Sequence, residues 1–187
     1  MLQSERKRNL FRMVLAAVFL ALAYVLPFLT AQIPRRGNML CPMHLPVLVC
    51  GFVCGPVWGA AVGFLAPILR TLTIGIPVPT TAIAMCAELA TYGLVSGLMY
   101  RSFPGKAVRV YASLLVAMIA GRGVYGVMNI MIYAVKAESY TPGLFLTSAF
   151  TNAVPGILLQ IGLIPVIVLA LEKAFPQYMG KKADRKE

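Results

Sequence analysis

Two ionisable residues lie inside long apolar runs, and their side chains are the first candidates for chemistry. Glu88 lies about seven residues from the start of run 81–100, and Arg122 about eleven residues from the end of run 110–133. If these runs cross a membrane, each such residue costs about 2.5–3.5 kcal/mol and usually faces the protein interior. At ~1.5 Å per residue the two depths differ by roughly 6 Å. We expect Glu88 and Arg122 either to hold a polar ligand or to form a buried ion pair that locks two helices.

Further polar residues share helix faces with these two. Residues three, four, seven or eight positions apart lie on one face of a helix. Such stripes are Glu88 with Tyr92, Arg122 with Tyr125 and Asn129, and Asn152 with Gly156 and Gln160. Amides in membrane helices commonly serve only as hydrogen bonds between helices, worth about 0.6 kcal/mol each. Because three stripes converge, we favour a polar pocket that opens toward the outside.

Two loops and three arginines are candidates for the rim of this pocket. Between them, loops 32–38 and 76–79 contain prolines with a restricted backbone and a conformationally permissive glycine, which suits an ordered lid. Arg35, Arg36 and Arg70 would give the rim a positive field that attracts an anion such as a carboxylate. The same arginines would equally suit contact with lipid headgroups.

The composition is that of a membrane protein, so apolar helices must position the candidate site residues. Of the 187 residues, 59% are hydrophobic and only 12% are charged, and the mean hydropathy is +0.80. A soluble domain usually has about 25% charged residues. A soluble enzyme, a disordered chain and a nucleic-acid-binding domain are therefore excluded. The net charge of +11 does not change this, because the Lys and Arg residues flank apolar runs, as in membrane proteins.

The hydropathy pattern predicts an all-α integral membrane protein with about six transmembrane helices. The apolar runs are 13–30, 42–55, 57–73, 81–100, 110–133 and 144–175. A helix needs about 20 residues to cross ~30 Å of hydrocarbon, so run 42–55 is short. We expect it to form a hairpin with the next run through Gly55-Pro56. Residues 74–80 should break the helices, and the last run should be tilted or kinked at Pro155.

The basic residues predict how the chain is oriented. If the spans alternate, twelve Lys and Arg residues lie on the side of the two termini, and four (Arg35, Arg36, Arg70 and Lys136) lie on the other. The positive-inside rule then places both termini in the cytoplasm. The expected organisation is a basic cytoplasmic tail 1–12, a six-helix membrane domain 13–175 and a basic cytoplasmic tail 176–187, in the cell membrane.

The small residues of the first run have two interpretations. Ala17 and Ala21 form a small-xxx-small pattern, which lets helices approach closely. The pattern could dock another membrane protein, or it could serve packing within the chain.

The sequence shows no sign of bond-breaking chemistry. It has no nucleophile motif, no carboxylate pair near a histidine and no phosphate-binding glycine loop. Cys41, Cys50, Cys54 and Cys86 are expected to be small buried apolar residues rather than a redox or metal site. We expect no enzyme, no cofactor and no metal, and any energy source for active transport would be another subunit.

Five segments carry a likeness to a known family. They are the pair Ala17 and Ala21, residues 43–51 (MHLPVLVCG), residues 55–59 (GPVWG) with Val62 and Gly63, residues 67–70 (PILR) and residues 88–97 (ELATYGLVSG). Together, across residues 10–175, they resemble the substrate-binding S-components of energy-coupling factor (ECF) vitamin transporters. The resemblance implies a six-helix bundle with cytoplasmic termini that captures a scarce water-soluble micronutrient from outside.

The resemblance also implies partners and a site. An S-component docks on a transmembrane coupling subunit, which is carried by two cytoplasmic ATPases, and topples to release its substrate inside. The alanine motif would give Ala17 and Ala21 the docking role. The implied substrate region holds Arg35, Arg70, Glu88, Tyr92, Arg122, Asn129 and Asn152.

The ligand and two alternative functions stay open. Residues 44–47 and 88–93 look most like family members assigned to pantothenate, with an arginine for its carboxylate and with Glu88 and the asparagines for its hydroxyls and amide. Niacin, folate and a pyridoxine-like compound remain possible. One alternative is a standalone facilitator or proton-coupled carrier that uses Glu88 as its proton site. The other is a small intramembrane enzyme acting on lipid, which the lack of a second acid near Glu88 disfavours.

Overall fold

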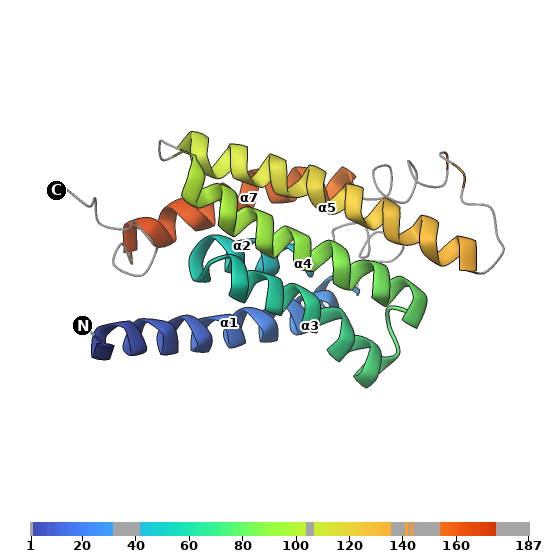
Figure 1. The fold of residues 1–187 in the computed structure, drawn as a ribbon, viewed down its shortest axis with the longest axis horizontal. Coiled ribbons are helices and arrows are strands. Elements are labelled where there is room, and N and C mark those ends of the chain that lie inside the picture. Colours follow the sequence, from blue (N-terminus) through green and yellow to red (C-terminus); the bar gives the residue numbers. More distant parts are fainter. Residues whose placement is uncertain are drawn as a thin grey trace.

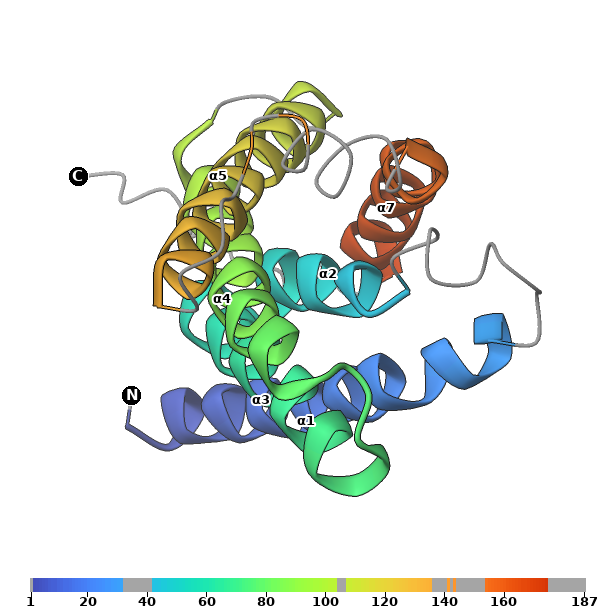
Figure 2. The same cartoon turned by 90° about the vertical axis from the view of Figure 1, so that its right-hand side faces the viewer.

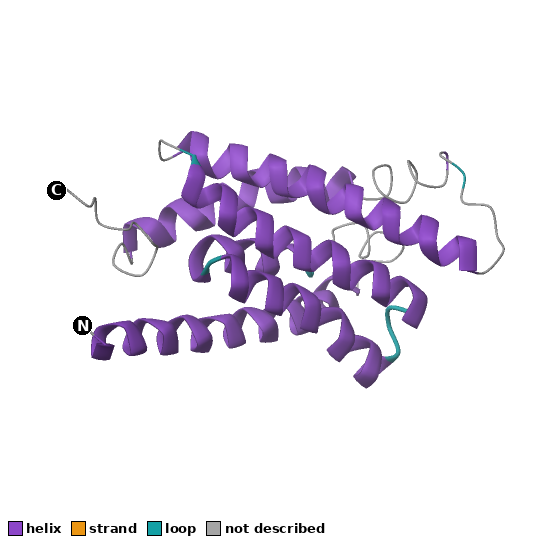
Figure 3. Ribbon diagram, viewed as in Figure 1, coloured by secondary structure: helices purple, strands orange, loops and turns teal. Residues whose placement is uncertain are grey.

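The computed structural model describes residues 2–31, 42–103, 107–135, 141, 143 and 154–174. These residues form six helices and no strand (Figures 1 and 3). The helices are α1 (Leu2–Ala31), α2 (His44–Cys54), α3 (Pro56–Ile74), α4 (Pro79–Ser102), α5 (Ala107–Val135) and α7 (Val154–Ala174). The predicted all-α fold class is confirmed, and residues 2–12, expected as a tail, continue α1.

The helices run alternately between two ends of the bundle (Figure 1). The start of α1, the α2–α3 turn, the α4–α5 connection and the end of α7 lie at one end. We call it the basic end, because it carries Arg6, Lys7, Arg101, Arg109 and Lys173. The end of α1, the α3–α4 loop and the end of α5 lie at the opposite end (Figure 1). Among the described helices, α1, α3, α4, α5 and α7 are long and apolar enough to cross a membrane.

Helix α2 is a short interior helix rather than a full crossing. Its 11 residues span about 16 Å, roughly half of the hydrocarbon core. Ten of them are buried, and the helix lies in the middle of the bundle, packed on α1, α3, α4 and α7 (Figure 2). Because protein surrounds α2, its polar helix ends do not have to face lipid. This agrees with the prediction that run 42–55 is short for a full crossing, and α2 completes the six predicted helices beside the five long ones.

Helices α2, α3 and α4 touch through their backbones at three glycines. A Cβ added to Gly59 would lie 2.6 Å from the Gly51 Cα and 2.6 Å from the Gly93 carbonyl oxygen. A Cβ added to Gly93 would collide with the Gly59 backbone in turn. Larger side chains would force the helices apart, since apolar association offers little gain in lipid and close packing must hold them together. This contact, the glycine contact, sets the spacing of the three central helices.

Prolines and glycines place the ends of α2, α3 and α4 where the sequence predicts them. Gly55 has φ 102°, a conformation that favours glycine, and Pro56 begins α3, so the predicted hairpin is confirmed. The predicted break is also confirmed, because α3 ends at Ile74 and α4 begins at Pro79. Pro155 is the second described residue of α7. The tilt or kink expected at Pro155 stays a prediction, because the residues before Val154 lie outside the described part of the chain. Residues 144–153 and the tail 176–187 lie outside the described residues.

Gly93→Ala should destabilise the bundle, because the added methyl group meets the Gly59 backbone, which has no flexible side chain to move aside. We expect a loss of roughly 1–3 kcal/mol in the free energy of unfolding. It can be measured by detergent-induced unfolding, with the single tryptophan, Trp58, as reporter.

The matched control is Gly123→Ala on the exposed side of α5, where nothing lies within 4 Å of an added Cβ. This variant should be unchanged or slightly more stable, because Ala favours a helix over Gly by up to about 1 kcal/mol. Equal destabilisation of both variants would contradict the glycine contact.

Candidate functional site

The two intramembrane ionisable residues form a buried ion pair. Glu88 Oε1 lies 3.0 Å from Arg122 Nη1 and 3.6 Å from His44 Nε2. The side chains of Glu88, Arg122 and His44 are 2%, 8% and 5% exposed. The predicted proximity of Glu88 and Arg122 is confirmed. The sequence predicted that Glu88 and Arg122 lie at different depths, because their positions were counted from the ends of their own helices. The two residues lie at the same depth because α5 extends beyond α4 at the end opposite the basic end (Figure 1).

Tyr92 lies one turn after Glu88 and is fully buried. Its ring packs edge-on against the ring of His44, with centroids 5.3 Å apart. On its other side the ring faces Gly121, where an added Cβ would lie 2.8 Å from a ring carbon. Gly121 therefore leaves room for the aromatic ring and lets α5 bring Arg122 against α4.

Gln160 of α7 lies at the depth of the Glu88–Arg122 pair. The register follows from Arg109, whose Nη2 donates to Glu172 Oε1 at 2.8 Å and to Tyr100 Oη at 3.0 Å. Tyr100, Arg109 and Glu172 therefore lie at one level at the basic end. Glu88 is 12 residues from Tyr100 on α4, Arg122 is 13 residues from Arg109 on α5, and Gln160 is 12 residues from Glu172 on α7. Each of these separations points away from the basic end and corresponds to about 18–20 Å along the helix. We call His44, Glu88, Tyr92, Arg122 and Gln160 the polar layer.

Two nitrogen atoms of the polar layer are buried without a hydrogen-bond partner among the described residues. Gln160 is 1% exposed, and within the described residues its Nε2 has no hydrogen-bond partner. The same holds for Nδ1 of His44. A buried amide or imidazole left in this state costs about 1–3 kcal/mol. Native proteins seldom retain such groups without a use for them.

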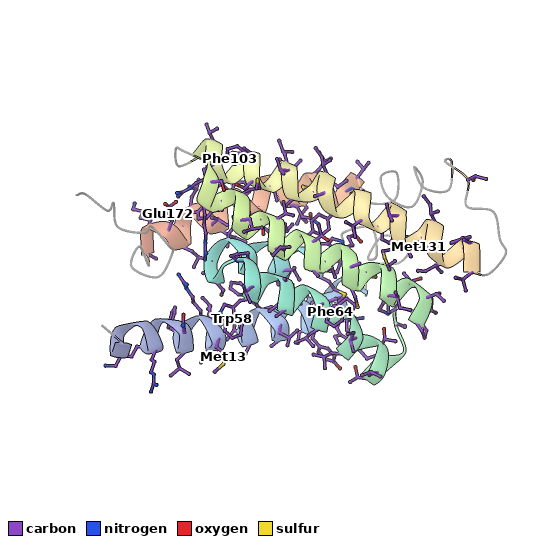
Figure 4. All side chains as sticks on the ribbon, viewed as in Figure 1. Met13, Trp58, Phe64, Phe103, Met131 and Glu172 are labelled. Atoms are coloured by element: carbon purple, nitrogen blue, oxygen red, sulfur yellow. The ribbon has the colours of Figure 1, made fainter. Side chains whose placement is uncertain are left out.

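The charged group at the basic end is built differently. Arg109 and Glu172 have side chains 13% and 20% exposed, and the guanidinium lies 4.1 Å from the centre of the Tyr100 ring. Glu172 lies at the end of the bundle where α4 joins α5 (Figure 4). The ion pair links α4, α5 and α7 at their ends, although Arg109 Nε and Glu172 Oε2 are buried without a hydrogen-bond partner among the described residues.

Arg70 lies apart from the polar layer. Its Nη1 donates to the Tyr24 carbonyl oxygen at 3.0 Å, and its guanidinium carbon lies 5.1 Å from the centre of the Phe28 ring. It is buried against α1. Gly63, seven residues earlier on α3, abuts the backbone of Leu89, so Arg70 is about 10 Å closer to the end opposite the basic end.

The remaining predicted site residues are only partly described. Asn129 is half-buried about 10 Å beyond Arg122, and its Nδ2 donates to the Tyr125 carbonyl oxygen at 2.8 Å. Arg35, Asn152 and loop 32–38 lie outside the described residues. Loop 76–79 is tied to α3, because Thr71 Oγ1 donates to the Pro77 carbonyl oxygen at 3.0 Å.

The alanines of α1 divide between two faces. Ala16 and Ala23 are buried and provide the packing within the chain, whereas Ala17 and Ala21 are exposed. Met13, one turn before Ala17, points away from the bundle (Figure 4). The small-xxx-small pair therefore lies on a face that this chain does not cover with its described residues.

An apolar groove lies elsewhere, between α3, α4 and α5. It has a volume of about 460 Å³, and its walls include Phe64, Ile68, Cys86 and Met128. Figure 4 shows Phe64 on α3. Almost no polar atom lines the groove, so it suits a lipid chain and not a polar ligand.

The cysteines behave as buried apolar residues. Cys50, Cys54 and Cys86 are buried and free, and Cys41 lies outside the described residues. The part of the chain that the structure describes contains no group of three or more His, Cys, Asp or Glu residues that could hold a metal ion.

One residue of the polar layer, His44, and one glycine beside the layer, Gly121, were not predicted from the sequence. His44 stands in a run too short for a full span, and an ionisable side chain at the start of such a run was a usable signal. Gly121 gave no signal, because its role depends on the ring of Tyr92 on another helix. Gln160 was predicted through its stripe.

The polar layer offers both hydrogen-bond donors and an acceptor. Arg122, Gln160 and Tyr92 can donate, and the Glu88 carboxylate can accept. The opposite charges of Glu88 and Arg122 cancel. Such a layer suits a small ligand with several hydroxyl or amide groups, shielded from water by apolar helices.

Residues 11–168 match the family model for the substrate-specific component of ECF transporters. No curated protein and no solved structure matches the chain. The family match spans most of the sequence and includes every residue of the polar layer. The chain therefore belongs to the family of substrate-specific components of ECF transporters.

Proposed function

We propose that this S-component captures a water-soluble vitamin, with pantothenate as the best candidate, from outside the cell. The vitamin binds at the polar layer, and the protein delivers it by docking on a transmembrane coupling subunit that two cytoplasmic ATPases drive. The family match supports the coarser part, a substrate-specific subunit of such a transporter. The protein itself performs no catalysis in this proposal.

The polar layer is the observation that carries the proposal. A pair that served only to lock two helices would need no further polar groups beside it. Here His44 Nε2 lies 3.6 Å from Glu88 Oε1, and Gln160 lies at the depth of the pair. His44 Nδ1 and Gln160 Nε2 are buried and lack a hydrogen-bond partner among the described residues. A polar ligand would satisfy these atoms and recover their desolvation cost.

The chemistry of pantothenate fits this set of groups. Its two hydroxyls and its amide can each donate and accept hydrogen bonds, which matches Arg122, Gln160 and Glu88. Glu88, Tyr92 and Arg122 are the proposed contacts at the polar layer. Arg35, Asn129 and Asn152 are proposed for the part of the site nearer the outside. Arg70 would join them after releasing the Tyr24 carbonyl oxygen.

The proposed orientation places the basic end in the cytoplasm. The positive-inside rule supports it, since the described basic residues Arg6, Lys7, Arg101, Arg109 and Lys173 gather there. The polar layer is then about 18–20 Å from the cytoplasmic level of Arg109. The site is thus proposed to open toward the outside, through the end where α3 joins α4.

The exposed pair Ala17 and Ala21 supports docking through α1. Small residues let another helix approach closely, and here they lie on a face that the chain leaves uncovered within its described residues. We propose this face as the contact with the coupling subunit.

The double variant Glu88→Gln with Arg122→Gln should lose pantothenate binding and keep its fold. The double change avoids leaving one buried charge without its partner, which would itself destabilise the protein by about 3–5 kcal/mol. We expect the affinity to fall at least about tenfold, because a charge-assisted hydrogen bond contributes ~1.5–3 kcal/mol. Isothermal titration of purified protein in detergent measures it, with helicity measured in parallel.

The matched control is Arg109→Gln with Glu172→Gln, which removes the same two charges at the basic end. Its affinity should stay within about threefold of the wild type. Equal loss in the two double variants, or no loss in the first, would reject the polar layer as the ligand site.

Ala17→Trp should stop uptake without changing ligand affinity, because the large ring would hold the coupling subunit away from α1. Uptake of labelled pantothenate into cells that express the complete transporter measures the first effect, and titration of purified protein measures the second. The control is Ala170→Trp, an equally exposed alanine on α7, which lies across the bundle from α1 (Figure 2). Normal uptake by the Ala17→Trp variant would remove the docking role from this face.

Uptake should depend on the coupling subunit and on ATP. In cells that lack the coupling subunit, we expect this chain to support no accumulation of labelled pantothenate above the background of the host. Undiminished accumulation there would favour a standalone facilitator or a proton-coupled carrier.

A further inference from the structure

We propose that the ligand enters with its uncharged, hydroxyl-bearing end toward the polar layer, while its carboxylate stays near the outer opening. The Glu88–Arg122 pair then remains intact in the bound state. This inference rests on the proposed function with pantothenate as ligand. It differs from the simplest expectation for such a site, in which the buried arginine binds the carboxylate of the vitamin.

The charge balance of the polar layer is the first argument. Glu88 and Arg122 neutralise each other at 3.0 Å, with side chains only 2% and 8% exposed. A ligand carboxylate at this depth would either displace Glu88 from Arg122 or share the guanidinium with it. Both arrangements leave one excess negative charge in a buried place, and the effective cost of an uncompensated buried ion is several kcal/mol.

The positions of the other cations are the second argument. Within the described residues, no other Lys or Arg lies at the depth of the polar layer. Arg70 lies about 10 Å away and bonds the Tyr24 carbonyl oxygen, and Arg109 lies about 18–20 Å away and pairs with Glu172. A second buried carboxylate would therefore find no cation of its own among them.

The unpartnered atoms are the third argument. Gln160 Nε2 can only donate a hydrogen bond, whereas a neutral imidazole has one donor and one acceptor nitrogen. A hydroxyl can donate and accept at once, so two neighbouring hydroxyls can satisfy both Gln160 and Nδ1 of His44 without adding charge. The carboxylate avoids its desolvation cost if it stays at the opening, where water reaches it.

Uptake of a proton by the polar layer on ligand binding would reverse this conclusion. His44 faces Glu88 from α2, Arg122 comes from α5, and the Tyr92 ring lies against the imidazole. With one added proton on His44 or on Glu88, the layer would carry a net positive charge and could accept a carboxylate. Binding would then consume close to one proton per ligand, which can be measured.

The test compares three probes on the wild-type protein by isothermal titration. The probes are pantothenate, pantothenol, in which a hydroxymethyl group replaces the carboxylate, and N-(3,3-dimethylbutanoyl)-β-alanine, which keeps the carbon skeleton, the carboxylate and the amide but lacks both hydroxyls. We expect pantothenol to bind within about fivefold of pantothenate and N-(3,3-dimethylbutanoyl)-β-alanine to bind at least about tenfold more weakly. Titration in two buffers of different ionisation enthalpy should show no proton uptake with pantothenate.

Which analogue binds more weakly decides the result. If pantothenol is the weaker one, or if pantothenate binding takes up about one proton, the proposed ligand orientation is overturned, while pantothenate binding itself stands. If none of the three probes binds, the pantothenate assignment fails and the inference fails with it.

The same comparison on the double variant Glu88→Gln with Arg122→Gln gives a second check. Its affinities for pantothenate and pantothenol should fall by the same factor, because neither loses a contact between Arg122 and a carboxylate. A much larger loss for pantothenate would show that Arg122 binds the carboxylate and would overturn the inference.

Discussion

The glycine contact between α2, α3 and α4 is the constraint on which both the fold and the site depend. In lipid there is little hydrophobic gain when one apolar helix leaves the tails for another, so close packing has to hold the helices together. Gly51, Gly59 and Gly93 allow backbone-to-backbone contact between the three central helices. The short α2 can then lie fully inside the bundle, with His44 at its start facing Glu88 and Tyr92 of α4. Gly121 extends the principle to α5 by making room for the Tyr92 ring.

Two charged groups lie at different depths along the bundle. At the basic end, Arg109 donates to Glu172 and Tyr100 and joins α4, α5 and α7. The polar layer lies about 18–20 Å further along the helices and is more deeply buried. Both groups contain buried atoms without a hydrogen-bond partner among the described residues, namely Arg109 Nε and Glu172 Oε2 at the basic end and His44 Nδ1 and Gln160 Nε2 in the polar layer. Because an unpaired polar atom costs more the deeper it is buried, the polar layer is the proposed ligand site.

The sequence predicted the central pair of the site but not its full surroundings. Glu88 and Arg122 were identifiable because a membrane makes every intramembrane charge costly, so each must have a partner or a function. Their helical stripes also pointed to Tyr92 and Gln160. Arg70 shows the limit of this reasoning. It was grouped with the outer rim by its position in the chain, but the face of α3 that carries it packs against Tyr24 and Phe28 of α1.

The sequence by itself determined that this is a helical membrane protein, where most of its helices begin and end, and which charges are too costly to be incidental. Those properties follow from hydropathy, from glycine and proline backbone preferences and from the cost of a charge in lipid, all of which act locally along the chain. Only the tertiary structure decided which residues meet: His44 with Glu88, Gly121 with Tyr92, Gln160 at the depth of the pair, and Ala17 and Ala21 on an outward face. Which residues meet depends on the rotation of each helix about its axis and on its shift along that axis. Contacts between residues distant in sequence fix the rotation and the shift, and no local pattern in the sequence encodes them.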